Sequence, residues 1–308
     1  MVKKVEEQTV EIDGRQLLVR NMTKVLYPAT GFTKGDVIAY YAKAAPTLLV
    51  HLGDRGVTLR RYPNGVDGMS FFEKRCASHR PEWIPSVVGP GDREGNIHYC
   101  KLDSVAAIVW AANMAALELH APMARGDDIE TATMVVFDLD PGAPAAMTEC
   151  AEIGLVLRDV LDGIGLECYP KTSGSKGLQI YVPVNVAGIT HEHASSFALA
   201  VGQAIEKQHG NRVLTAMKKD LRKGKVFIDW SQNSRHKTTI CAYSLRARPH
   251  PTVSTPVTWD EVSDAADGAD LSFEANQVVE RIETLGDLWA PTATQQQEIP
   301  QPRGSSRR

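Results

Sequence analysis

Hydrophobic positions along this chain follow helical spacing in some segments and strand-like spacing in others. Runs with helical spacing, most of them preceded by a capping residue, predict helices after Thr33 and Thr258, over the run VAAIVWAANMAALEL (105–119) after Ser104, over 147–162, and from Thr190 to near Gly210. Apolar runs with strand-like spacing predict strands in the segments GVTLRRY, TMVVFDLD, LQIYVPV and KVFIDWS. Because strands and helices do not strictly alternate, the order favours an α+β or mixed α/β fold over a doubly wound sheet.

The last segment of the chain has a different pattern. Residues 292–308 lack apolar periodicity and are rich in Gln, Pro and Ser, which predicts a disordered tail. The preceding 1–291 contain no internal repeat and no long linker. They have room for one large domain or for two smaller ones.

Composition narrows the class of protein. Hydrophobic residues make up 43% of the chain and charged residues 23%, which is typical of a soluble globular protein. The charged N-terminus does not have the pattern of a signal peptide, and no stretch has the roughly 18 apolar residues of a membrane span. We therefore expect a cytoplasmic, nucleoid-associated protein with no membrane partner.

The cysteines are five in number and scattered, with no CxxC pair. An odd, unpaired set argues against a disulfide framework and against a structural zinc site. We expect reduced thiols.

Charge is unevenly distributed. The net charge is −3, yet eleven Lys and Arg lie between Lys207 and Arg248, opposed only by Asp220 and Asp229. A locally basic stretch in an acidic protein indicates a site for a polyanion. The alternative is a solvated basic face.

Three aspartates lie at strand positions. Side chains alternate along a strand, so Asp138 and Asp140 of VVFDLDPG share one face, about 7 Å apart. Asp229 closes the apolar strand of KVFIDW, where burial of its charge is costly unless a cation or metal compensates it. Together the three form a ligand set for two Mn²⁺ or Mg²⁺ ions. The DxD pair also occurs in glycosyltransferases and as a plain strand end.

Two further segments have a functional and a structural interpretation. The loop KTSGSKG (Lys171–Gly177) precedes a strand, and its glycines, hydroxyls and Lys176 suit a phosphate, although a hairpin turn explains it equally well. Phe71 and Phe72 are adjacent on an extended segment near Arg60 and Arg61. An exposed ring there can stack on a base, whereas the alternative places both rings in the core.

Taken together, these segments resemble the polymerase domain of bacterial DNA ligase D, within the archaeo-eukaryotic primase superfamily. The resemblance runs from about Val19 to Leu285 and rests on KVLYPATG, YPNGVDGMSFFEK, LELHAP, VVFDLDPG, TSGSKG, GKVFIDWSQN and KTTICAYSLRARPHPTV. It implies an α+β primase-like core, in which an RRM-like sheet carrying the three acids (131–291) packs against an N-terminal α/β lobe (1–130).

The resemblance also implies roles for single residues. Asp138, Asp140 and Asp229 become the catalytic metal ligands. By the resemblance, the residues that surround the incoming nucleotide are Arg60, His120, Ser173, Lys176, Arg222, Gln232 and Arg246, with Asn21 a weaker candidate. Lys24 and Lys34 match a pocket for the 5′-phosphate of DNA, and Phe71 and Phe72 match aromatics that stack on the template.

The chain departs from the family pattern at several positions. It has Gln179 where the family has His, Tyr62 where it has Trp, and Ala242 where it has Pro. A further departure is the stretch from His120 to Arg125, where the family has an HVPQW-like run. None of these positions is one of the three acids.

The implied activity is nucleotidyl transfer by a two-metal mechanism. We expect a stand-alone enzyme, since no ligase or nuclease segment accompanies these motifs, that fills gaps or joins DNA ends and favours ribonucleotides. Its partners become DNA ends or gaps with a 5′-phosphate, nucleoside triphosphates, Ku and a separate DNA ligase. The alternatives are a metal-dependent nuclease, a DxD glycosyltransferase, and a non-catalytic DNA-end-binding module with a degenerate primase fold.

Overall fold

A computed structural model describes residues 6–91, 95–126 and 128–300, and divides the chain into two compact units. Unit 1 comprises Met1–Pro122, Thr238–Thr255 and Ser272–Asp287, and unit 2 comprises Met123–Lys237, Pro256–Leu271 and Leu288–Arg308. The predicted lobes, 1–130 and 131–291, match these units only in part, because two later segments return to unit 1. Thr238–Thr255 and Ser272–Asp287 join unit 1 through contacts with residues far away in the sequence. Local sequence patterns do not reveal such contacts.

Unit 1 contains a six-stranded sheet with the order β15-β9-β5-β8-β7, in which β6 also pairs with β5. Its strands are β5 (Gly56–Arg61), β6 (Phe71–Glu73), β7 (Ser86–Pro90), β8 (Asn96–Lys101), β9 (Ala116–Ala121) and β15 (Thr239–Ile240). Two small hairpins precede it, formed by β1 (Glu7–Ile12) with β2 (Arg15–Arg20), and by β3 (Val25–Tyr27) with β4 (Phe32–Thr33).

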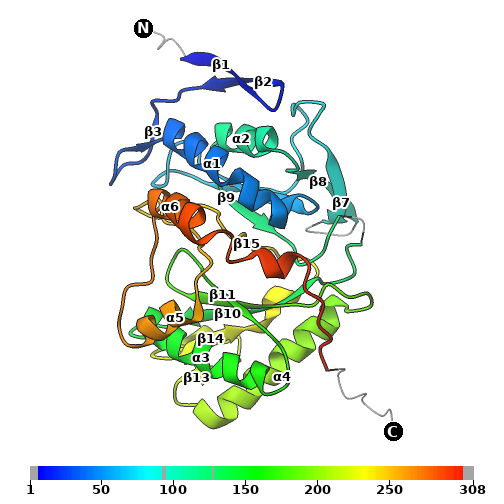
Figure 1. Cartoon of the computed structure of the whole chain (residues 1–308), viewed down its shortest axis with the longest axis vertical. Coiled ribbons are helices and arrows are strands. Elements are labelled where there is room, and N and C mark those ends of the chain that lie inside the picture. Colours follow the sequence, from blue (N-terminus) through cyan, green and yellow to red (C-terminus); the bar gives the residue numbers. More distant parts are fainter. Residues whose placement is uncertain (1–5, 92–94, 127, 301–308) are drawn as a thin grey trace. The chain divides into compact units, whose positions relative to one another are not determined.

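Three helices belong to unit 1: α1 (Lys34–Leu52), α2 (Val105–Asn113) and α6 (Ala275–Leu285). The predicted caps of α1 and α2 are present, because Thr33 forms a capping box with Asp36 and Ser104 accepts from the Ala107 amide. Helices α1 and α2 lie side by side (Figure 1). The buried Tyr41 of α1 donates from its hydroxyl to the carbonyl of Leu117 on β9, 2.7 Å away, and so ties the helix to the sheet.

Unit 2 contains a five-stranded sheet with the order β11-β12-β10-β14-β13. The strands are β10 (Met134–Pro141), β11 (Tyr169–Thr172), β12 (Leu178–Pro183), β13 (Val213–Leu214) and β14 (Val226–Asp229). All neighbouring pairs are antiparallel except β13 with β14. The helices are α3 (Met147–Asp162), α4 (His191–His209) and α5 (Trp259–Ala266), with short 3₁₀ turns η1 (Lys219–Leu221), η2 (Trp230–Asn233) and η3 (Ala290–Ala293).

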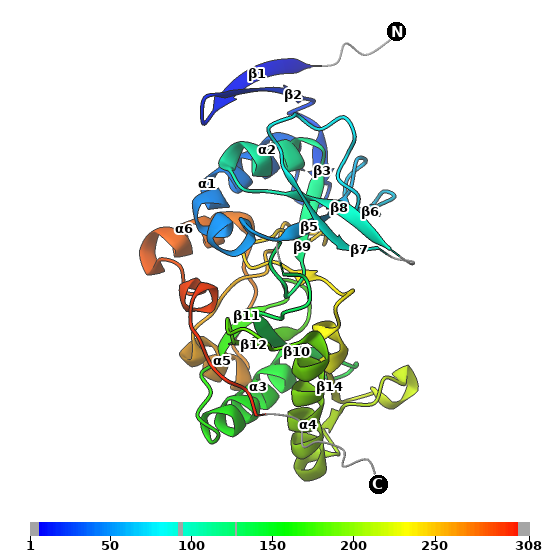
Figure 2. The same ribbon diagram turned by 90° about the vertical axis from the view of Figure 1, so that its right-hand side faces the viewer.

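Helices α3 and α4 cover one face of the unit 2 sheet, and Figure 2 shows both on the same side of it. On that face Leu139 of β10 lies opposite Leu178 and Ile228 in the neighbouring strands. A side chain at Gly154 of α3 would come within 2.9 Å of Leu178, so a glycine lets the helix pack closely on the sheet. Since side chains alternate along β10, Asp138 and Asp140 point away from these helices.

The segment predicted as part of a disordered tail is ordered as far as residue 300. Gln297 donates from its side-chain amide to the carbonyls of Glu167 and Pro183, and its backbone amide donates to Val184. Polar glutamines satisfy backbone groups of unit 2 here, so the absence of apolar periodicity does not indicate disorder. Residues 301–308 of the predicted tail lie outside the described residues.

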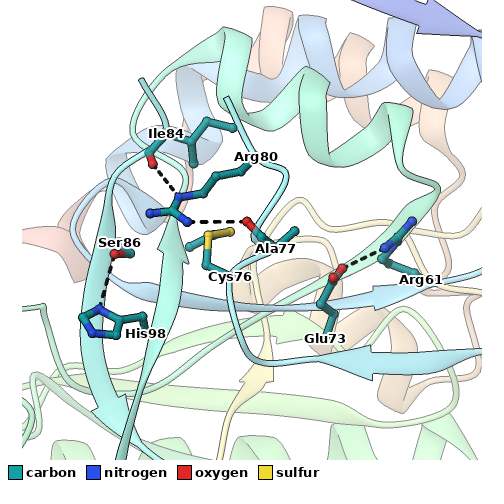
Figure 3. Close-up of a disulfide and its surroundings, with 9 residues drawn as sticks. Arg61, Glu73, Cys76, Ala77, Arg80, Ile84, Ser86 and His98 are labelled. Atoms are coloured by element: carbon teal, nitrogen blue, oxygen red, sulfur yellow. Dashed lines mark hydrogen bonds and ion pairs between the residues drawn. A yellow bond between two sulfur atoms is a disulfide. The ribbon is translucent and has the colours of Figure 1, made fainter. Parts of the chain in front are cut away.

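Cys76 and Cys100 form a disulfide, with Cα atoms 4.6 Å apart, which corrects the expectation of reduced thiols for this pair (Figure 3). Cys100 lies on β8, and the backbone amide of Cys76 donates to the carbonyl of His98 on the same strand. Beside the disulfide, Arg80 donates to the carbonyls of Ala77 and Ile84 and so fixes the loop after Cys76 (Figure 3). The remaining three cysteines, Cys150, Cys168 and Cys241, carry thiols and are buried.

Among the residues that the structure describes, none of the helices has the length and apolar character needed to cross a lipid bilayer.

Candidate functional site

Four residues from four neighbouring strands of unit 2 form one row across the sheet. Lys171 on β11 is the register partner of Gln179 on β12, Gln179 is the partner of Asp138 on β10, and Asp138 is the partner of Asp229 on β14. In antiparallel pairs, directly opposite side chains lie on the same face. The row therefore lies on the face opposite α3 and α4, and it joins two of the three predicted acids.

Hydrogen bonds link the members of this row. The Gln179 Nε2 donates to Asp138 Oδ1 at 3.0 Å, and the Lys171 Nζ donates to Gln179 Oε1 at 2.5 Å. Asp229 accepts from the amide and hydroxyl of Ser231, and from the Gln232 Nε2 at 2.9 Å. The structure thus brings the predicted nucleotide-binding Gln232 into contact with one of the acids.

The third acid, Asp140, lies two residues along β10, on the same face, and its register partner on β14 is Phe227. The guanidinium of Arg222 lies 3.6 Å from the centroid of the Phe227 ring. The backbone of Arg222 lies close to Gly142, where a Cβ would lie 1.9 Å from the Arg222 carbonyl oxygen, so this position requires glycine. The predicted Arg222 is thereby placed beside the strand positions that carry the acids.

Negative charge accumulates on this face. The pKa of Asp138 is raised to about 7, first because the carboxyl is buried, and then because Asp140 and Asp229 repel its negative charge. The hydrogen bond from Gln179 and the charge of Lys171 act in the opposite direction. The row therefore has a deficit of positive charge, which a divalent cation would remove.

The donor chemistry fits such a cation, although the side chains are not gathered around a single point. In the described part of the chain, no group of three or more His, Cys, Asp or Glu side chains is arranged to hold a metal ion. Asp138 and Asp229 are instead each turned toward an amide side chain. Three carboxylates on one face match the oxygen ligands that Mg²⁺ and Mn²⁺ prefer.

The loop between β11 and β12 is a hairpin turn, as the structural alternative predicts. The Ser173 hydroxyl accepts from the amides of Ser175 and Gly177, and the Lys176 Nζ donates to the carbonyl of Pro141 at 3.1 Å. A Cβ at Gly177 would lie 2.3 Å from the Leu139 carbonyl oxygen, so only glycine lets the loop pack this closely on β10. The loop holds Ser173 and Lys176 at the end of the strand that carries Asp138 and Asp140.

Three of the predicted nucleotide-binding residues converge in unit 1 on one carboxylate, Glu118 of β9. One oxygen accepts from Arg246 Nε at 3.2 Å and from the Ala247 amide, and the other contacts His120 Nε2 at 3.0 Å and Arg60 Nη1 at 3.4 Å. The Glu118 side chain is only 2% exposed. A buried carboxylate therefore holds two arginines and a histidine together.

Sequence reasoning missed Glu118. Burial alone would raise the pKa of its carboxyl, but the hydrogen bond from His120 and the charge of Arg246 outweigh burial and lower the pKa to about 2. Burial also lowers the pKa of His120. The helical run predicted after Ser104 extends to Leu119, but α2 ends at Asn113 and Ala116–Ala121 form β9. Had LELHAP been predicted as a strand, the positions of Glu118 and His120, two apart, would have placed both on one face.

Phe71 and Phe72 are both exposed, by 46% and 55%, so the alternative that buries both rings is wrong. On the paired strand β5, Arg61 lies opposite Phe71 and Arg60 opposite Phe72. Each guanidinium lies over the ring of its partner, at 5.2 and 5.0 Å from the centroid. Exposed rings held by cations are suited to stacking on bases.

Lys24 and Lys34 also lie together in unit 1. Lys34 Nζ donates to the Arg20 carbonyl and to Asn113 Oδ1, and Lys24 Nζ donates to the Pro63 carbonyl. The pKa of Lys34 is lowered to about 8 by burial and then by the charges of Lys24, Arg20 and Arg61. This concentration of positive charge suits an anion. Asn21 accepts at its carbonyl from the Lys24 amide, which places it beside the lysines.

Comparison with known proteins places these features in a family. The family described as "LigD, primase-polymerase domain" matches residues 33–289. The multifunctional non-homologous end joining protein LigD of Mycolicibacterium smegmatis is 44% identical over 275 residues, which cover 88% of this chain and 35% of that protein. The bifunctional non-homologous end joining protein LigD of Bacillus subtilis is 29% identical over 271 residues, which cover 88% of this chain and 43% of that protein.

A solved structure matches over nearly the same range. It is the polymerase domain from Mycobacterium tuberculosis ligase D in complex with DNA, with a TM-score of 0.85 and 42% sequence identity. The match covers 91% of this chain and 98% of that domain. In contrast, the chain spans only about a third of the length of the mycobacterial relatives it matches.

Proposed function

This chain belongs to the LigD primase-polymerase domain family, and on that premise we propose that it extends DNA 3′ ends at breaks or gaps during end-joining repair. The observation that carries the proposal is the row across the unit 2 sheet, in which Asp138 and Asp229 face each other with Asp140 on the same face. Carboxylates at these positions suit the charge neutralisation that nucleotidyl transfer requires.

The family match and the solved structure confirm three predictions from the sequence: the family resemblance, the α+β primase-like fold, and the nucleotidyltransferase class. The polymerase domain of this family is a metal-dependent nucleotidyltransferase. The choice of Mn²⁺ or Mg²⁺, the number of ions and a preference for ribonucleotides stay predictions for this chain.

The proposed reaction is attack of a primer 3′-hydroxyl on the α-phosphorus of a nucleoside triphosphate, with pyrophosphate as the leaving group. Asp138, Asp140 and Asp229 would hold the divalent ions, which when bound supply activation of the hydroxyl and neutralisation of phosphate charge. The chain itself positions the reactants. In unit 2 that role falls to Ser173, Lys176, Arg222 and Gln232.

The cations of unit 1 supply the other proposed contacts. Glu118 keeps Arg60, His120 and Arg246 grouped, and we assign this group to the incoming nucleotide. Lys24 and Lys34, with Asn21 beside them, are assigned to the 5′-phosphate of a downstream strand, and Phe71 and Phe72 to the template. Ku and a separate DNA ligase stay predicted partners.

Primer extension tests the proposal directly. The protein is incubated with Mn²⁺, nucleoside triphosphates and a labelled primer in a gapped duplex that carries a 5′-phosphate. Template-dependent lengthening of the primer supports the proposal. Shortening of the primer would indicate a nuclease instead, and a mobility shift without any change in length would indicate a DNA-end-binding module.

A further inference from the structure

Lys171 is a lysine that the proposed reaction does not use, and it is 1% exposed. Burying an ammonium group is costly unless hydrogen bonds and opposite charge compensate for the lost water. Its Nζ donates to Gln179 Oε1 and lies 5.5 Å from the centroid of the Tyr181 ring. Among the acids of the row, Asp138 is the one on which the charge of Lys171 acts.

The two ends of the row determine how the Gln179 amide is oriented. Lysine only donates hydrogen bonds, and an ionised carboxylate only accepts them. With Lys171 on one side and Asp138 on the other, the amide must turn its oxygen to the ammonium and its NH₂ group to the carboxylate. The Tyr181 hydroxyl also donates to the same oxygen, at 3.4 Å. Gln179 therefore accepts a hydrogen bond from Lys171 and donates one to Asp138.

Charge in the row is partly balanced by the same lysine. Lys171 lowers the pKa of Asp138, whereas Asp140 and Asp229 raise it. Lys171 and Gln179 are both buried, where charges are less screened than in water, so the charge of Lys171 still acts on Asp138 from beyond Gln179. Lys171 is two strands away from Asp138, on the far side of Gln179.

We propose that Lys171 is a positioning residue for Asp138: it fixes the Gln179 amide against this carboxylate, and it supplies a cation that partly offsets the negative charge there. The role requires at position 179 a side chain that accepts a hydrogen bond on one side and donates one on the other, as the glutamine amide does. A neutral imidazole also has one donor and one acceptor, so either side chain can pass the hydrogen bond from Lys171 to Asp138.

The inference rests on the proposed function, and it predicts effects of opposite sign on two measurements. Replacing Lys171 with Met releases Gln179, so kcat for primer extension should fall by about 10- to 100-fold, with the nucleotide KM little changed. The loss of a positive charge near the carboxylates should meanwhile tighten Mn²⁺ binding by about tenfold. If Lys171 only maintained the fold, its replacement would lower both kcat and the affinity for Mn²⁺.

A double-mutant cycle separates the two effects. Gln179→Leu should lower kcat as much as Lys171→Met does but leave Mn²⁺ affinity within about twofold of the wild-type value. The double variant should be no slower than either single variant, because Lys171 acts on turnover only through Gln179. Its Mn²⁺ affinity should match that of Lys171→Met. Lys43→Met, on the exposed side of α1, is the control for removal of a charge.

Mn²⁺ affinity is measured by electron paramagnetic resonance without nucleotide or DNA, so this measurement does not depend on turnover. If the wild-type protein binds Mn²⁺ but extends no primer, the proposed function fails, while tighter binding by Lys171→Met still supports the role of Lys171. If kcat losses multiply in the double variant, or if Mn²⁺ binding weakens in Lys171→Met, the inference is overturned.

Lys171→Gln keeps the inference testable if the Met variant does not fold. Its amide can still donate to Gln179 but has no charge. We expect it to recover most of the kcat that Lys171→Met loses while showing the same tightened Mn²⁺ binding. A Gln variant that resembles the wild-type protein in Mn²⁺ affinity would show that the charge of Lys171 does not act on the carboxylates.

Discussion

Asp138 and Asp229 are direct cross-strand partners on β10 and β14, although α3, α4 and three strands separate them along the chain. Their carboxyl groups lie on one face of the sheet, and the charge of Asp229 adds to desolvation and to the charge of Asp140 in raising the pKa of Asp138. A buried acid, Asp229, held opposite a half-buried one, Asp138, lowers the stability of a protein unless the pair serves a cation. This pair is therefore the centre of the proposed catalytic site.

Removing either acid should stop nucleotide addition without preventing DNA binding. Asp138→Asn and Asp229→Asn keep the size of the side chain but remove its charge, and we expect primer extension to fall by about 1,000-fold or more. Affinity for DNA should change little, because it rests on Lys and Arg contacts to phosphate. Gel shift and extension assays on the same preparations check both; extension within tenfold of the wild-type rate would remove these acids from the catalytic centre.

Glu118→Gln should weaken nucleotide binding and change the pH dependence of stability. The folded protein holds the pKa of Glu118 near 2, below the ordinary value of 4.5, so folding favours the charged form. This stabilisation, about 3 kcal/mol, is complete above pH 4.5 and is lost as the pH falls toward 2. Urea denaturation at several pH values should show a shallower decline in this range for the variant.

The same variant should also raise the nucleotide KM, because Arg60, His120 and Arg246 lose the carboxylate that groups them. We expect an increase of about tenfold or more, measured by steady-state primer extension. An unchanged KM in a folded Glu118→Gln protein would show that this group does not bind the nucleotide.

The 5′-phosphate preference should depend on Lys24 and Lys34 and on pH. Gapped DNA with a 5′-phosphate should bind more tightly than DNA with a 5′-hydroxyl. The difference should decrease as the pH rises from 7 to 9, because Lys34, with a pKa of about 8, loses its proton. The double variant Lys24→Ala, Lys34→Ala should show no preference at any pH. Lys43→Ala, an exposed lysine of the same helix α1, is the matched control.

The disulfide between Cys76 and Cys100 predicts the number of thiols that can be titrated in the unfolded protein. Unfolded without reductant, the protein should expose three thiols, those of Cys150, Cys168 and Cys241, and five after reduction. Reduction should lower the free energy of unfolding by about 3 kcal/mol, because the disulfide lowers the conformational entropy of the unfolded chain. Five thiols without reductant would support the expectation from the sequence that all cysteines are reduced.

Local patterns in the sequence were sufficient for the elements of unit 2 that carry the site, but not for β9 of unit 1, whose first residues were predicted as the end of a helix. The helix over 147–162, the capping boxes at Thr33 and Thr258, and the strands that hold Asp138, Gln179 and Asp229 were all predicted correctly. Period and capping are local properties, because they depend on residues at most four apart. The resemblance to the family, which rests on ordered motifs, supplied the candidate residues.

Only the tertiary structure decided which of these residues meet. Strand register places Lys171, Gln179, Asp138 and Asp229 in one row, and register depends on pairing between strands that are far apart in sequence. The grouping of three cations on Glu118, the disulfide, the ordered segment 292–300 and the return of 238–255 to unit 1 are long-range contacts of the same kind. Spacing along the chain does not encode such contacts, since they form between whole elements once these have packed.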